Sequence, residues 1–349
     1  IDDVISEARD FENLNPEDIE QMSVLKDASA TAVYGARAAN GIILVTTKQG
    51  KVGKMNVDYN FNYNLTKPAY LPKKLNSYEA LSSQNLAREN DGMAPVTSEE
   101  DLLKYKNGTD PYNFPNTDWY ELCMRNFAPE QRHNLAVRGG NETLKVYSAL
   151  GYYDQGSIYK TNSVNMQRYN FRTNIVATFK EIGLKFSSGV DAYIWDMTEP
   201  YTHQGRGSAT IWSHIVTHEP WYLGYNQYGQ LSNNPNNPLV DISSDGGYFK
   251  QQRTTVRGNM GLEWDVPFLQ GLKLKALGSY AIANDRDKAW QKTPYMYDLE
   301  GNPNEPSKPN LSKNTYYHRN FTTQFFADYN RTFNNLHSIG AMFGLEASG

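Results

Sequence analysis

One long segment, between residues 195 and 251, interleaves aromatic rings with amide and guanidinium side chains. Its candidate contact residues are Trp212, Trp221, Tyr222, Tyr225, Tyr228, Arg206, Asn226 and Gln227. Flat rings stack on the C–H face of a sugar, while amide and guanidinium groups hydrogen-bond its hydroxyls. The same mixture suits a peptide backbone, and it also suits a loop that packs on itself. We therefore expect ligand contacts here, with loop packing as the alternative.

No other set of residues assembles into a catalytic centre. His214 and His218 could bind a metal if they were helical, but Ile215 stands where the zinc-protease pattern requires Glu. We expect a pair of loop histidines and no metal. The carboxylates at 2–3 and 99–101 are expected to be solvated turn or helix-start residues. Nucleophile elbows and phosphate-binding loops are absent, so we expect neither an enzyme nor a cofactor.

The composition excludes some partners and leaves the class of protein open. The 349 residues carry a net charge of −4 without a basic run, which argues against nucleic-acid binding. Cys123 is the single cysteine, so no intrachain disulfide can form, and a small buried thiol is expected. The mean hydropathy is −0.68. Transmembrane strands nevertheless escape hydropathy analysis, because their apolar residues occupy alternate positions.

Polar and apolar residues alternate with period two after Gly53. Tyr169, Phe171, Ile175 and Phe179 alternate with Arg168, Asn170, Arg172 and Asn174. Period two places the two sets on opposite faces of a strand, and we expect the apolar set to face lipid and the polar set a wet lumen. The predicted strands lie near 56–66, 131–139, 144–155, 167–179, 184–195, 251–265, 272–284, 316–333 and 337–346. One helix, over 76–89, is predicted in the first long loop.

The connections between these strands alternate between short and long. The short ones lie near 139–142, 180–183, 267–271 and 334–335. In an up-and-down meander they all fall at one end, as in outer-membrane barrels, which have short periplasmic turns and long outer loops. Nine strands make a barrel too narrow to enclose a folded segment of the chain, which takes about 22 strands. We therefore expect a fragment of a longer protein.

The first fifty residues contain a more specific signal. Residues 19–25 are expected to be extended, with Asp27 capping a short helix that ends at Gly35. The apolar run 42–45 is expected to be a strand buried on both faces. The residues from Asn15 to Glu20, followed by VLKDASATAVYGARAANGIILVTTK, closely resemble the end of the plug domain in SusC/RagA-like TonB-linked outer-membrane transporters.

This resemblance implies a plugged antiparallel β-barrel in the outer membrane. Residues 1–48 would be the C-terminal part of the plug, 49–55 a linker, and 56–349 the first barrel strands. It also implies TonB-dependent uptake of large nutrients, usually oligosaccharides and less often peptides, with a SusD-like lipoprotein over the outer loops. Arg37 would join a polar contact between plug and barrel. The alternatives are an outer-membrane barrel enzyme and a soluble carbohydrate-binding β protein.

Overall fold

The structure is a computed structural model of the chain. It describes residues 1–349 apart from 3, 5, 7, 27–40, 203–204, 244–245 and 335, and only the backbone of residues 202, 205, 206 and 208. The helix expected after Asp27, Gly35 and Arg37 therefore lie outside the described residues.

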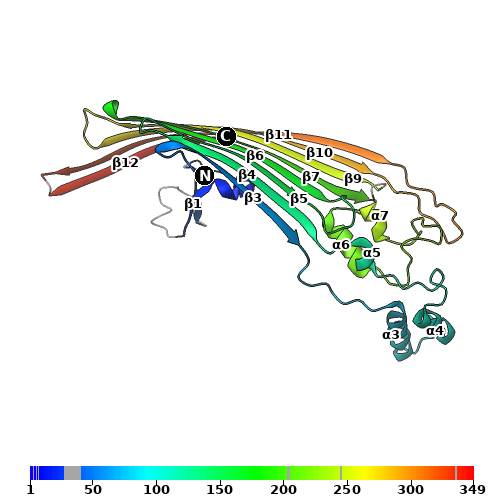
Figure 1. Cartoon of the computed structure of the whole chain (residues 1–349). Coiled ribbons are helices and arrows are strands. Elements are labelled where there is room, and N and C mark those ends of the chain that lie inside the picture. The colour runs from blue at the N-terminus through cyan, green and yellow to red at the C-terminus, as the bar shows by residue number, and fades with distance from the viewer. Residues whose placement is uncertain are drawn as a thin grey trace.

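One long curved antiparallel sheet dominates the molecule (Figure 1). Its strands are β3 (Gly53–Thr66), β4 (Ala128–Gly140), β5 (Leu144–Gln155), β6 (Asn165–Phe179), β7 (Leu184–Thr202), β9 (Tyr248–Asp265), β10 (Leu272–Gln291), β11 (Asn310–Phe333) and β12 (His337–Ser348). Each pairs with its neighbour in the chain, and β8 (Gly205–Arg206) extends the end of β7. The nine predicted strands are confirmed, although β7, β10 and β11 run further toward the long loops than predicted.

The four short connections all lie at one end of the sheet, as the meander requires. They join β4 to β5, β6 to β7 through the 3-10 turn η3 (Lys180–Ile182), β9 to β10, and β11 to β12. Gly183 ends the η3 turn with a φ of 67°, and an added Cβ there would collide with the carbonyl oxygen of Asp265. Glycine is therefore required at this close approach of two backbones.

The two faces of the sheet differ as the alternation predicts. On β6, Tyr169, Phe171 and Phe179 are exposed on one face, where Ile175 also lies. Arg168 and Asn170 point to the other face and donate hydrogen bonds to the backbone carbonyls of residues 12 and 13. The polar face is thus the one that the N-terminal residues cover.

The N-terminal segment, residues 1–50, lies against the concave face of the sheet (Figure 1). It contains α1 (Ala8–Glu12), η1 (Pro16–Asp18), and the antiparallel pair β1 (Ile19–Leu25) and β2 (Ile42–Thr47). The expectation that 42–45 is buried on both faces is wrong, because Ile43 is 53% exposed while Val45 is 4% exposed. Ile43, Val45 and Thr47 are on the same side of β2, so burial changes along the strand: its Thr47 end is buried at the sheet, and its Ile43 end is exposed.

The long connections carry several helices rather than one. The predicted helix is α3 (Ser77–Asn90), which begins with a capping box between Asn76 and Glu79. Four more helices, which the sequence did not indicate, are α4 (Glu99–Asn107), α5 (Trp119–Cys123), α6 (Ser208–Thr217) and α7 (Pro238–Ile242). Among the described residues, no helix is long and apolar enough to cross a bilayer.

Helices α5, α6 and α7 share a hydrophobic core, which we call the loop cap. Its buried members are Trp119, Cys123, Met124, Tyr159, Ile211, Ile215, Leu239 and Ile242. These residues come from three different connections, so each short helix completes its apolar surface with residues far away in the sequence. No single window of the sequence therefore carries the periodic signal.

Candidate functional site

Arg172 is the centre of the interface between the N-terminal segment and the sheet. Its side chain is 5% exposed and lies 3.3 Å from the carboxylate of Asp2, 4.0 Å from Asp18 and 3.6 Å from Asp191. A fourth contact goes to the hydroxyl of Thr47, at 3.1 Å. One buried guanidinium thus pairs with carboxylates from both sides of the interface, and a buried charge requires such partners.

Asp18 and Tyr147 form a second buried contact of this interface. The Tyr147 hydroxyl donates a hydrogen bond of 2.7 Å to the Asp18 carboxylate, and Asp18 is 2% exposed. Burial raises the pKa of Asp18, while the hydrogen bond from Tyr147 and the charge of Arg172 oppose that rise.

Further polar contacts lie on both sides of this centre. Arg257 forms an ion pair with Asp10, and Arg9 forms one with Asp285 at 3.0 Å. The amide of Asn15 donates to that of Asn134 at 2.7 Å. Hydrogen bonds and ion pairs therefore make up much of this interface, beside the buried apolar side chains of Leu14 and Val45. Such contacts can exchange with water when the surfaces separate.

Asp2 corrects one expectation from the sequence. It was expected to be a solvated turn residue, but its carboxylate accepts hydrogen bonds from the backbone N–H and the hydroxyl of Thr47 and pairs with Arg172. The sequence placed Arg172 on the wet face but did not indicate its partners in the N-terminal segment, because these lie 125 to 170 positions away. Asp101 does lie at a helix start, where Ser98 caps α4.

The two histidines of the loop cap take separate partners. His214 lies in α6, not in a loop as expected, and its Nδ1 is 2.5 Å from the carboxylate of Asp241. His218 is 4% exposed and its Nε2 is 2.9 Å from the Asn234 side-chain oxygen. Burial lowers the pKa of His218. Within the described ranges, no group of three or more residues could hold a metal ion.

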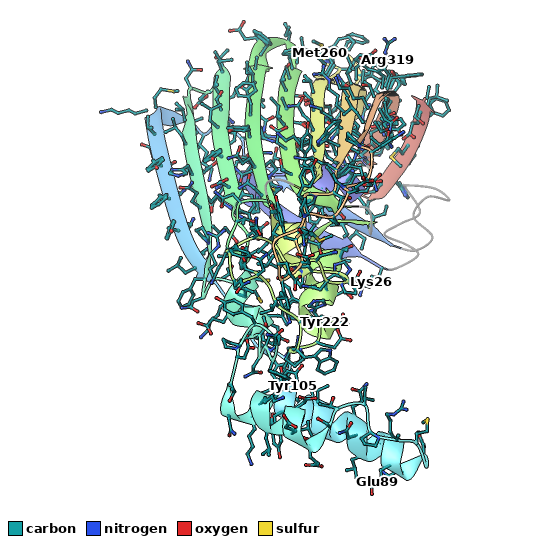
Figure 2. All side chains as sticks on the ribbon, turned by 90° about the vertical axis from the view of Figure 1, so that its right-hand side faces the viewer. Lys26, Glu89, Tyr105, Tyr222, Met260 and Arg319 are labelled. Carbon is teal, nitrogen blue, oxygen red and sulfur yellow. The ribbon has the colours of Figure 1, made fainter. Side chains whose placement is uncertain are left out.

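The candidate aromatic residues divide between packing and exposure. Trp212 stacks on Tyr120 and packs against the loop-cap core, and Tyr222 stacks on His218 with ring centroids 5.2 Å apart. Trp221 is half-buried, whereas Tyr225 is 42% and Tyr228 61% exposed. Tyr222 lies among the loops beyond the sheet (Figure 2).

The polar candidates Asn226 and Gln227 shape the loops in this structure. The Asn226 side chain is 3% exposed; it donates to the carbonyl of Asp298 and accepts from two backbone N–H groups. Gln227 donates to the carbonyl of Leu299. The side chain of Arg206 lies outside the described residues. These contacts tie residues 226–230 to the loop that follows β10.

A cavity of about 300 Å³, lined partly by asparagine side chains, adjoins the loop cap. Its lining residues are His214, Asn233, Asn234, Pro235, Asn236, Asn237, Val240, Asp241 and Met296. Asn234 and Asn237 use their amides to bond neighbouring carbonyls, while Asn233 and Asn236 are exposed. The four asparagines within 233–237 are the sequence signal for this cavity.

Comparisons with known proteins indicate the family to which this chain is related. The TonB-dependent receptor plug domain family matches residues 1–42. The TonB-dependent receptor SusC of Bacteroides thetaiotaomicron is 30% identical over 299 residues, which are 77% of this chain and 27% of SusC. The TonB-dependent receptor P39 of Formosa agariphila is 26% identical over 97% of this chain and 30% of its own length. The chain belongs to the SusC-like TonB-dependent receptors.

Solved structures of the RagAB peptide importer share the fold of this SusC-like chain. In the open-open state the match covers 99% of this chain and 40% of the importer chain, with a TM-score of 0.77 and 21% identity. A second structure, of the RagAB peptide transporter, gives a TM-score of 0.75 at 22% identity. The chain thus spans less than a third of the curated relatives named above. In the terms of this family, the N-terminal segment is plug and the sheet is barrel wall.

Proposed function

We propose that the chain is part of an outer-membrane transporter that imports large nutrients, oligosaccharides foremost, with energy supplied through TonB. The observation that carries the proposal is the interface centred on Arg172. A plug segment rests on the polar face of a strand meander through contacts that water can replace, while the opposite face exposes apolar side chains. A transmembrane β-barrel with a movable plug has this distribution: its exterior is apolar where it faces lipid, and its interior is polar where it faces the plug.

The loop end of the sheet supports the proposed partners and ligand. The loop cap offers a structured surface on which a SusD-like lipoprotein can sit, opposite the short turns from which TonB would act. For the substrate, the exposed rings of Tyr225 and Tyr228 and half-buried Trp221 supply stacking surfaces, and Asn233 and Asn236 supply free amides at the cavity. Amides and rings bind peptides as well as sugars, so a peptide importer is the alternative that the experiment addresses.

The test uses the full-length receptor in its own bacterium. A strain without the receptor gene is grown on plant and microbial oligosaccharides of five or more units, and separately on a tryptic peptide mixture, as sole carbon or nitrogen source. We expect a growth defect on one oligosaccharide class, restored by the intact gene but not in a strain that lacks TonB. A defect on peptides alone would assign the alternative substrate class, and no defect on any source would overturn the proposal.

The cavity is tested in the same strains. Asn233→Ala combined with Asn236→Ala should slow uptake of the identified substrate while the amount of receptor in the outer membrane stays unchanged. Gln84→Ala, on the exposed surface of α3, is the matched control and should have no effect. Normal uptake by the double variant would remove the cavity from the substrate path without affecting the proposal of import.

A further inference from the structure

Five basic side chains gather on the outward face of β9, β10 and β11. Arg257 of β9 and Asp285 of β10 contact the plug, so odd-numbered residues of these two strands point inward and even-numbered residues point outward. On β11 the odd-numbered residues point outward, because Lys313 is directly opposite Lys288. The basic residues at outward positions in the loop-side half are Lys250, Arg286, Lys288, Lys313 and Arg319. No outward position of these three strands, which are described throughout, carries an acidic residue.

The register brings like charges directly together. Lys288 lies opposite Lys250 on one side and opposite Lys313 on the other. Like charges in directly opposite positions destabilise a sheet unless something compensates them. None of the ion pairs found among the described residues includes any of the five, although the same strands form several on the inward face.

Tyr248 fixes two of these ammonium groups in place. The Nζ atoms of Lys250 and Lys288 lie 5.1 and 5.2 Å from the centre of its ring. Cation–π contacts of this kind hold the charges side by side without neutralising them. Two of the five groups are therefore preorganised, and none of the five is in an ion pair; the nearest outward carboxylate, Asp196 of β7, accepts a hydrogen bond from Gln252.

An apolar surface lies on the short-turn side of Lys250, Lys288 and Lys313 and surrounds Arg319, which is directly opposite Ile282. Val256, Met260, Tyr280, Ile282 and Phe321 are all outward and all between 46% and 65% exposed. Met260 and Arg319 are both at the rim of the molecule on the side away from the plug (Figure 2). Charge and apolar surface thus follow each other along the same strands.

We propose that this basic cluster binds the phosphate-bearing headgroup of an outer-leaflet lipid, whose acyl chains lie on the apolar surface beside it. Lysine and arginine donate charge-assisted hydrogen bonds to phosphate oxygens, and such clusters beside an apolar band recognise anionic lipids. A free anion would use the charges but not the adjoining apolar surface. The proposal rests on the proposed outer-membrane location.

The test measures lipid binding by the purified full-length receptor. Native mass spectrometry in detergent follows titration with diphosphorylated lipid A, with the same lipid A after phosphatase treatment, and with inorganic phosphate. We expect saturable binding of the diphosphorylated lipid, at least tenfold weaker binding of the dephosphorylated one, and none of phosphate at the same concentration. Equal binding of both lipids, or binding of inorganic phosphate alone, would overturn the assignment.

Variants locate the site. Combining Lys250→Gln, Lys288→Gln and Lys313→Gln should weaken binding of diphosphorylated lipid A at least tenfold, whereas Lys→Arg at the same positions should retain it. Arg331→Gln removes an outward basic residue at the opposite end of β11 and is the matched control. Wild-type affinity in the triple Gln variant would refute the proposal. Because import is measured separately in cells, failure here leaves the proposed transport function standing.

Discussion

At the scale of single residues, Arg172 makes several of the contacts that attach the plug to the wall. Its guanidinium serves three carboxylates within 4.0 Å, and two of them, Asp2 and Asp18, belong to the plug. Removing one partner of a buried ion pair strands the charges that remain, which costs far more than the net worth of the pair.

We predict that Arg172→Met weakens the attachment of the plug by about 3–5 kcal/mol. The measurement is the urea concentration at which a fluorophore on the plug reports release in the full-length receptor. Lys180→Gln, which breaks an exposed pair with Glu142 away from the plug, is the control and should leave the midpoint unchanged. An unchanged midpoint in the Arg172 variant would show that the buried network does not hold the plug.

His218 makes the loop cap sensitive to acid. Burial between the rings of Trp119 and Tyr222 lowers its pKa, so the folded cap favours the neutral ring. An unfolded histidine takes up a proton near pH 6.5, and the folded one only at a lower pH. The cap is therefore at full stability above about pH 6.5 and loses stability as the pH falls below that value.

We predict that hydrogen-exchange protection factors in α5 and α6 fall between pH 7.5 and pH 5. His218→Gln should remove most of this pH dependence, because glutamine does not titrate in that range. Protection that changes equally in both proteins would assign the pH effect to other groups.

At the scale of elements, each strand of the wall separates outward-facing apolar residues from plug-facing polar residues by period two. Ile175 lies on the outward face of β6, near the middle of the strand, while Phe179 lies on the same face at its short-turn end. The cost of a charge on the lipid face depends on its depth in the bilayer.

We predict that Ile175→Arg destabilises the folded receptor by about 2–4 kcal/mol, and Phe179→Arg by about 0–1 kcal/mol. Unfolding of the full-length receptor in lipid vesicles by guanidinium provides the measurement. Equal costs for the two variants would contradict the depth assigned to Ile175.

The elements also show what the sequence could predict. The alternation of polar and apolar residues at 168–179 and the spacing of the short turns are local signals. The strands, their two faces and the placement of the short turns at one end of the sheet could therefore be predicted from the residues alone. The helices α5, α6 and α7 share a core assembled from distant connections, and no local pattern announces it. For the same reason the candidate rings Trp212 and Tyr222 were correctly placed in the long loop, but their packing partners were not foreseeable.

At the scale of the whole molecule, plug and wall meet in one largely polar interface that the proposed transport would have to open. The side chains of Asn15 and Asn134 face each other across it, with a hydrogen bond of 2.7 Å. The natural cysteine does not complicate thiol chemistry there, because Cys123 is fully buried and its pKa is raised to about 12.

We predict that a reversible bis-methanethiosulfonate cross-link between Asn15→Cys and Asn134→Cys stops import by the full-length receptor, and that a reductant restores it. A pair at Glu142→Cys and Lys180→Cys joins two parts of the wall and should leave import unaffected when cross-linked. Import that continues through the locked plug would mean that the plug need not leave this surface.

The four short connections at one end of the sheet also affect how the protein can be assembled. Each long strand pairs with its neighbour in the chain, so the wall can grow one hairpin at a time with short loops to close. The plug, by contrast, is made first and bonds to strands that emerge later, from β4 to β10. The wall can therefore form locally, hairpin by hairpin, whereas the seat of the plug is complete only when the strands from β4 to β10 are already side by side.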